Sequence, residues 1–205
     1  MAKTKATLVS LVMVGACAFG AWKVGTCVLG EDEASSAEHF VNRVWLERMP
    51  EDDRDMITHL VALDTRDGRF GAVGRSSAWR HVLEIFKWHR EDSQLTLFFP
   101  QERTKAQFDI RTWDCKGEAP RPFELCLELS RGHRSVTFYS RYDLVVDPHA
   151  VAENGEAAVA ELVAEHAELE PFARSLATID AESILGVDAE GEDADDAAAW
   201  SFFGQ

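Results

Sequence analysis

The stretch that decides the fold is residues 94–142, which read QLTLFFPQERTKAQFDIRTWDCKGEAPRPFELCLELSRGHRSVTFYSRY. Apolar and polar residues alternate there through four runs, and turn signals separate the runs. A period of two is typical of antiparallel strands that bury one face. The alternating positions are Leu95, Leu97 and Phe99; Ala106, Phe108 and Ile110; Leu125, Leu127 and Leu129; and Val136, Phe138, Ser140 and Tyr142. The stretch therefore predicts four antiparallel strands.

Four earlier segments also have strand character. They are 40–48, 55–63, 69–74 and 84–90. A short helix competes over the first of them, and Asp-Gly between the second and third is a hairpin turn signal. The spacing of the apolar residues over 76–88 also fits a helix, but a turn joins the end of this segment to the strongly predicted strand that follows. Because the hairpin partner of a strand is itself a strand, we predict a strand there.

These segments together make about eight strands joined by short turns. No crossover of about a dozen residues separates them, so the pattern excludes a parallel sheet and favours a meander. A meander removes its exposed edges best by closing into a barrel. We predict a mainly β fold, an antiparallel meander of about eight strands closed as an up-and-down barrel over 40–146, followed by C-terminal helices.

The charge of the chain is concentrated near its C-terminus. The 205 residues, 46% of them hydrophobic, suffice for one domain with appendages and carry a net charge of −15. Residues 147–205 hold fifteen acidic residues against the single Arg174, a charge of −14, so residues 1–146 hold −1. Because nucleic-acid binding requires a basic face, we expect no nucleic-acid partner.

Residues 1–30 have the pattern of an export or anchoring segment. Lys3 and Lys5 precede an uncharged apolar run that continues to Trp22. This order is typical of a signal peptide or a membrane anchor. Positive charge at the start keeps that end in the cytoplasm, so we expect the domain outside it.

If the protein is exported, this segment has three possible outcomes. Residues 14–17, VGAC, resemble the lipobox of bacterial lipoproteins, which implies that Cys17 is the lipidated first residue of the mature chain. Cleavage after Ala18 would instead give a soluble secreted protein, and no cleavage would leave an anchor of about 20 residues. A buried helix of a cytosolic protein is the remaining alternative. The polar residues 31–39 then form a tether to the domain.

The cysteines of the domain support export. Cys115 and Cys126 both fall on the mainly polar face of neighbouring predicted strands, which would place them side by side. Disulfides persist in oxidising compartments, so we predict a disulfide between them. Two free thiols are the alternative.

The predicted barrel resembles the lipocalin-like, or calycin, barrels. Like them, it opens with a tryptophan-bearing strand, here with Trp45, and carries an arginine on a late strand, here Arg141. The resemblance covers 40–144 in strand count and order. It implies a barrel that holds a small apolar ligand.

The chain has no motif that specifies a reaction. The glycines of 68–76, GRFGAVGRS, lack the spacing and the lysine of a phosphate-binding loop. The seven histidines form no H-x-x-x-H or H-E-x-x-H group, and there is no G-x-S-x-G elbow. We therefore expect no metal, no cofactor and no catalytic residue. The dense aromatic residues are predicted to fill the barrel core, alone or beside a ligand pocket.

The acidic C-terminal part divides into two segments. Residues 147–186 read as a helical extension, with an amphipathic helix over 156–168 and a second helix over 172–185. Residues 187–205 read as an acidic disordered tail because of their low complexity. The tail ends in Trp200, Phe202 and Phe203, which either offer a peptide to a partner or fold back on the domain.

These observations predict a location better than a reaction. We expect an exported, membrane-tethered, non-catalytic β-domain of the bacterial cell envelope that binds a small apolar ligand or an envelope protein partner. A structural or assembly protein that acts through its acidic helical tail is the first alternative. An enzyme built in the barrel mouth is the second.

Overall fold

The structure of the chain is a computed structural model, and it describes residues 37–170, 172, 186, 188 and 191–203. These belong to the compact unit Ser35–Gln205. The elements are η1 Ala37–His39, β1 Arg43–Leu46, β2 Ile57–Thr65, β3 Gly68–Ser76, β4 His81–Glu91, β5 Gln94–Phe99, β6 Thr104–Asp114, β7 Leu125–Arg131, β8 Arg134–Ser140, α1 Pro148–Glu165, η2 Ala167–Leu169, β9 Glu192–Asp193 and α4 Asp196–Ser201.

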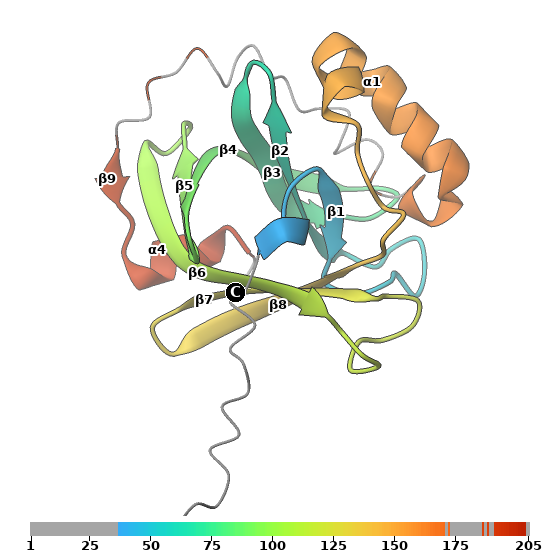
Figure 1. The fold of residues 1–205 in the computed structure, drawn as a ribbon, viewed down its shortest axis with the longest axis horizontal. Coiled ribbons are helices and arrows are strands. Elements are labelled where there is room, and N and C mark those ends of the chain that lie inside the picture. The colour runs from blue at the N-terminus through green and yellow to red at the C-terminus, as the bar shows by residue number, and fades with distance from the viewer. Residues whose placement is uncertain (1–36, 171, 173–185, 187, 189–190, 204–205) are drawn as a thin grey trace, which may run out of the picture. The chain divides into compact units, whose positions relative to one another are not determined.

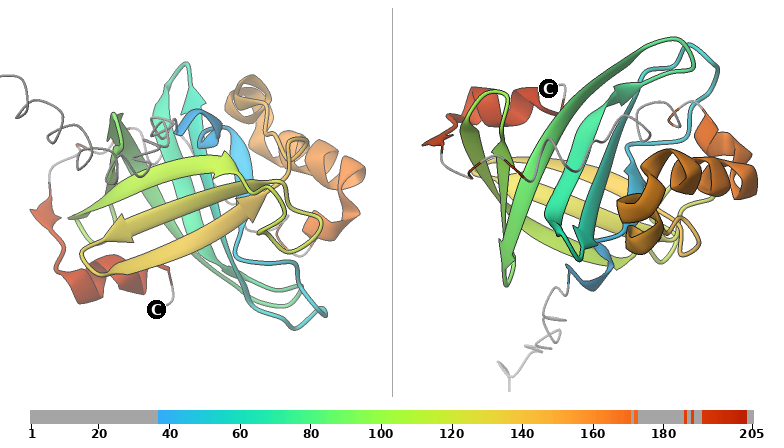
Figure 2. Two further views of the ribbon diagram at one scale, coloured as in Figure 1. Left: turned by 60° about the horizontal axis from the view of Figure 1, so that its bottom comes forward. Right: turned by 90° about the horizontal axis from the view of Figure 1, so that it is seen from above.

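Strands β1 to β8 form a closed antiparallel barrel, as predicted. Each strand pairs with the next along the chain, and β1 also pairs with β8 through Leu46 and Tyr139. Figures 1 and 2 show the strands curving round a common interior, with α1 outside the barrel. The fold is therefore mainly β, with helices that follow the barrel in sequence.

Tight turns set the register of three hairpins. Two residues separate the paired ends of β2 and β3, of β4 and β5, and of β7 and β8. Asp92 and Gly132, the first loop residues of two of these turns, have positive φ, which suits the twist of two-residue hairpins. Because successive strands run in opposite directions, the connections alternate between two ends of the barrel. We call these the η1 end, which holds the two tight turns that follow β2 and β4, and the α4 end, which holds the tight turn that follows β7.

The turn between β7 and β8, at Gly132, lies at the α4 end, together with the β1–β2, β3–β4 and β5–β6 connections. The β2–β3 and β4–β5 turns and the longer β6–β7 connection lie at the η1 end. Every connection is thus assigned to one end by the alternation of strand direction alone.

The predicted alternation appears directly in the burial of the strands. In β6, Ala106, Phe108 and Ile110 are buried, while Gln107 and Asp109 between them are exposed. Buried side chains of this parity from the strands form one cluster inside the barrel. Residues 81–91 are a strand, which confirms the strand prediction over the helical one for 84–90.

A second apolar cluster lies on the outer face of β1, β2 and β3. Val61 and Leu63 of β2 point outward there, and Val159 and Leu162 of α1 belong to the same cluster. Helix α1 is kinked at Asn154, whose side chain accepts a hydrogen bond from the backbone N–H of Ala157; its second part corresponds to the helix predicted from 156, and its first part begins earlier, at Pro148. The side chain of Asp147 accepts a hydrogen bond from the backbone N–H of His149, and a proline occupies the start of the helix. Both are ordinary helix-start signals.

The sequence prediction for the C-terminal tail differs from the structure over 191–203. These residues form β9, which pairs in parallel with the start of β6, and helix α4. Trp200 and Phe203 are 0% and 2% exposed. Low complexity predicted disorder, but two large aromatic side chains supply apolar area that the composition of the segment conceals. The second predicted helix, 172–185, lies almost wholly outside the described residues.

Candidate functional site

Aromatic side chains from the end of the chain pack into the barrel interior. The ring of Trp200 lies 5.4 Å from that of Phe108, and the ring of Phe203 lies 5.4 Å from Phe108 and 6.1 Å from Phe138. Phe202 stacks on Phe99 at 3.6 Å. We call residues 191–203 the C-terminal plug. The aromatic residues at the end of the chain therefore fold back on the domain.

Polar contacts hold the plug at the α4 end of the barrel. Arg131, at the end of β7, lies 2.9 Å from the carboxylate of Asp196 and donates to the backbone oxygen of Ala194 at 2.7 Å. The guanidinium of Arg134 lies 5.1 Å from the centre of the Trp200 ring. An ion pair, a hydrogen bond to the backbone and a cation–π contact thus join the plug to two arginines at the β7–β8 turn.

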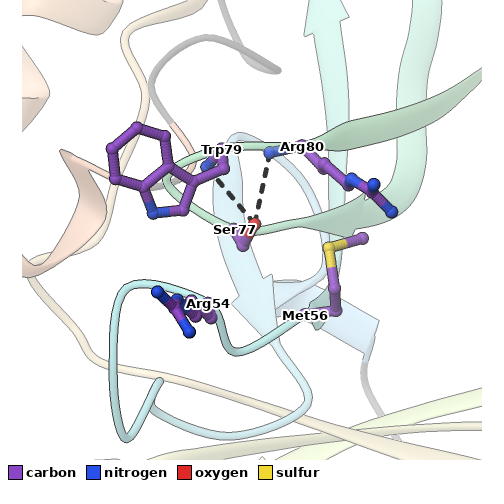
Figure 3. Close-up of a pocket in the computed structure, with 5 residues that line it drawn as sticks. All are labelled: Arg54, Met56, Ser77, Trp79 and Arg80. Carbon is purple, nitrogen blue, oxygen red and sulfur yellow. Dashed lines mark hydrogen bonds between the residues drawn. The ribbon is translucent and has the colours of Figure 1, made fainter.

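A hollow of about 500 Å³ lies at the rim of the α4 end. We call it the rim hollow. It lies between the β1–β2 loop and the β3–β4 connection, and Figure 3 shows its lining. The lining residues are Arg54, Met56, Ser77, Trp79 and Arg80. This volume is within the range typical of small-molecule sites, about 300–1,000 Å³.

Hydrogen bonds fix the two walls of the rim hollow. The hydroxyl of Ser77 accepts from the backbone N–H groups of Trp79 and Arg80, at 3.3 and 3.2 Å, and so shapes the β3–β4 connection. The backbone N–H of Ala78 donates to the carbonyl of Asp53 at 3.1 Å, which joins this connection to the β1–β2 loop. The loop is also braced within itself, because Arg48 pairs with Asp55.

Trp79 is the most exposed large apolar side chain of the described residues. It is 72% exposed, and Val82 nearby on β4 is 62% exposed. An indole left in water on a polar rim is typical of a contact surface. Sequence reasoning counted Trp79 among the dense aromatic residues, some of which were expected to line the interior, and missed the hollow. Paired serines at 76–77 before Trp79, which break the alternation of β3, were the signal for a turn there.

The two domain cysteines come together as predicted. Cys115 and Cys126 lie in disulfide contact, with their Cα atoms 5.4 Å apart. Both residues are buried, although their parity places them on the outward face. The direct cross-strand partners of Cys126 are Trp113 and Tyr139, whose large side chains share that face and shield it. Cys17 lies outside the described residues, as does the whole of 1–30.

The two residues that carry the lipocalin-like resemblance occupy different surroundings. Trp45 lies on β1 inside the barrel, fully buried, and its indole N–H donates to the carbonyl of Phe40 at 3.0 Å. Arg141 lies just beyond the end of β8 rather than on a late strand. Its guanidinium pairs with Glu168 at 2.6 Å and with Asp143. These ion pairs raise the pKa of Arg141, so it remains a cation that binds the C-terminal region to the barrel.

His59 is the one fully buried histidine of the described residues. Neither ring nitrogen has a hydrogen-bond partner in that part of the chain, and the ring lies 5.5 Å from the ring of Phe172. Burial lowers the pKa of His59 to about 4, so the imidazole is neutral at physiological pH. Within the described residues, no group of three or more His, Cys, Asp and Glu side chains could hold a metal ion.

Gly68 to Ser76 form strand β3 and not a phosphate-binding loop. Gly71 is required by close packing, because a Cβ atom there would lie 2.2 Å from the carbonyl oxygen of Val61. Among the described residues, no helix is both long and apolar enough to span a membrane. Comparison of the chain with protein families, with curated proteins and with solved structures gives no match.

Proposed function

We propose that the chain is an exported, membrane-tethered, non-catalytic barrel of the cell envelope, and that it binds its ligand or protein partner at the rim hollow. The observation that carries the proposal is the contrast between two aromatic groups at one end of the barrel. Trp200 and Phe203 of the plug are buried inside, whereas Trp79 is 72% exposed above a hollow of about 500 Å³.

The packing of Trp200 and Phe203 inside the barrel supports binding at the surface. A small apolar ligand inside the barrel would have to displace Trp200 and Phe203, and each buried aromatic side chain is worth about 3–5 kcal/mol of stability. The rim hollow needs no such displacement. The first alternative, assembly through the acidic tail, has less support because the apolar side chains at the end of that tail are already buried.

The tether and the location rest on the N-terminal sequence. Lys3, Lys5 and the apolar run that follows favour export, and Cys17 is the candidate lipidation site. The disulfide pair supports the same compartment, because disulfides persist where conditions are oxidising. The domain would then stand outside the cytoplasm, tethered to the membrane through 31–39.

An apolar fluorescent probe such as anilinonaphthalene sulfonate separates rim binding from interior binding. We expect no stoichiometric binding inside the intact barrel, and we expect added binding when residues 191–205 are deleted. One probe molecule bound per intact chain, with loss of the Trp200–Phe108 ring contact seen by nuclear magnetic resonance, would contradict the proposal and favour an interior carrier.

A further inference from the structure

We infer that the rim hollow binds a ligand that carries a phosphate or carboxylate group beside a ring or another flat apolar portion. This inference rests on the proposed function and adds the chemical class of the ligand. It follows from the charges that line the hollow, from their lack of partners, and from the exposed indole beside them.

The hollow has two positive charges that come from different segments. Arg54 belongs to the β1–β2 loop, and Arg80 belongs to the β3–β4 connection. Figure 3 shows them on opposite walls, with the side chain of Met56 directed toward the connection that carries Arg80. No carboxylate of the described residues lines the hollow.

Both guanidinium groups lack a partner. In the part of the chain that the structure describes, neither Arg54 nor Arg80 forms an ion pair or a side-chain hydrogen bond. Four other arginines of the barrel are paired with carboxylates, those of Asp55, Asp64, Glu128 and Asp196. The rim hollow instead brings together two guanidinium groups without such a partner.

Two of the four acidic residues beside Arg54 have other partners. Asp55 pairs with Arg48, and the carboxylate of Asp52 accepts from the backbone N–H of Arg54 at 2.8 Å. Among the described residues no carboxylate, including those of Glu51 and Asp53, forms an ion pair with the guanidinium of Arg54, which is open to an external anion. Guanidinium groups bind phosphate and carboxylate oxygens with paired, charge-assisted hydrogen bonds.

The apolar part of the ligand is set by Trp79 and Met56. A 72% exposed indole offers a flat face for a ring, and the thioether of Met56 adds an adaptable apolar surface within the same hollow. The hydrogen bonds accepted by the Ser77 hydroxyl and the one donated by the backbone N–H of Ala78 hold both walls in place, so little ordering is needed when a ligand binds.

The test is calorimetric titration of the full domain with four probes, with the indole N–H signal of Trp79 as a local reporter. The probes are phenyl phosphate, benzoate, inorganic phosphate and phenol. We expect phenyl phosphate and benzoate to bind more tightly than inorganic phosphate or phenol, and to shift the Trp79 signal. Preference between the first two identifies the acidic group, phosphate or carboxylate.

Variants assign the binding to the named residues. Arg54→Gln and Arg80→Gln should each weaken phenyl phosphate binding at least tenfold, whereas Trp79→Ala should weaken phenyl phosphate but leave inorganic phosphate unchanged. Arg66→Gln is the matched control, because Arg66 is an exposed arginine on the β2–β3 turn at the opposite end, and it should change nothing.

The outcomes separate the ligand class from the site. Binding of phenol as tight as that of phenyl phosphate, with no loss in the two arginine variants, would overturn the anionic class and leave the rim hollow as the binding surface. No shift of the Trp79 signal with any probe would overturn the small-ligand inference. Capture of an envelope protein that depends on Trp79 would then still support the proposed function, and its absence would refute that as well.

Discussion

Replacing Trp200 by alanine should destabilise the barrel even though the residue lies five positions from the end of the chain. Trp200 is 0% exposed and packs edge-on against Phe108 at 5.4 Å and beside Phe203 at 5.9 Å. Truncation of a buried tryptophan costs about 3–5 kcal/mol. The Trp200 indole N–H is buried without a partner, so its removal returns part of an unpaired-group penalty of about 1–3 kcal/mol.

The net loss that we expect is therefore about 3 kcal/mol, a large part of the total stability of about 5–15 kcal/mol of an ordinary domain. Urea unfolding measures it as a lower midpoint with an unchanged slope. Trp200→Phe keeps an aromatic ring and removes the unpaired N–H, so it should lose less.

Trp79→Ala is the matched control for this experiment. Trp79 is 72% exposed, so its truncation should change the free energy of unfolding by no more than about 0.5 kcal/mol. If Trp200→Ala is as neutral as Trp79→Ala, the plug does not belong to the core and the reasoning from ring contacts is refuted.

Three further changes test other parts of the fold. The pKa of His59 is about 4 in the folded chain against an ordinary value of 6.5, so the unfolded chain takes up a proton before the folded chain does as the pH falls. The stability of the barrel is therefore full above pH 6.5, and about 3 kcal/mol of it is lost as the pH falls to 4. His59→Leu should reduce the pH dependence of urea unfolding between pH 7 and 4, and an unchanged dependence would contradict the buried neutral imidazole. Gly71→Ala should lower stability against heat by about 1–3 kcal/mol, because the new Cβ would meet the Val61 carbonyl oxygen. Gly155→Ala in α1 is the control, and it should be neutral or stabilising because the space around Gly155 is open. Equal effects of the two substitutions would exclude the close approach at Gly71. Replacing both Cys115 and Cys126 by alanine should cost about 3 kcal/mol from loop entropy, and addition of a reductant should then have no further effect on the melting temperature.

The barrel could be predicted from the sequence because its signals are local. The alternation of Ala106, Phe108 and Ile110 with polar residues fixes which face of β6 is buried, and it does so without knowledge of any other strand. The tight turns between paired strands supply the order of the meander. Closure then follows from the need to remove two sheet edges.

The plug and the rim hollow could not be predicted in this way because contacts distant in sequence create them. Trp200 is buried against Phe108, which lies 92 positions earlier, and nothing in the acidic, alanine-rich sequence around Trp200 specifies that partner. The two walls of the rim hollow are joined by a hydrogen bond from the backbone N–H of Ala78 to the carbonyl of Asp53. Backbone hydrogen bonds between loops cannot be predicted from the types of residue in those loops.

For the cysteines, the pairing could be predicted from the sequence but the burial could not. Their pairing follows from strand neighbours and parity, both of which are local. Their burial depends on Trp113 and Tyr139 across two different strand pairs, so the polar parity of the face was a poor guide to exposure.

The most direct test of an exported, tethered barrel is the intact mass of the protein expressed with its native N-terminus in a bacterium that processes lipoproteins, recorded with and without reduction. We expect the protein in the membrane fraction, with a mass that rises by about two daltons on reduction because one disulfide has formed in an oxidising compartment. A chain that begins at an acylated Cys17 would identify the tether as lipid. An unprocessed, fully reduced chain in the soluble fraction would contradict the proposed location, and with it the proposed role in the envelope.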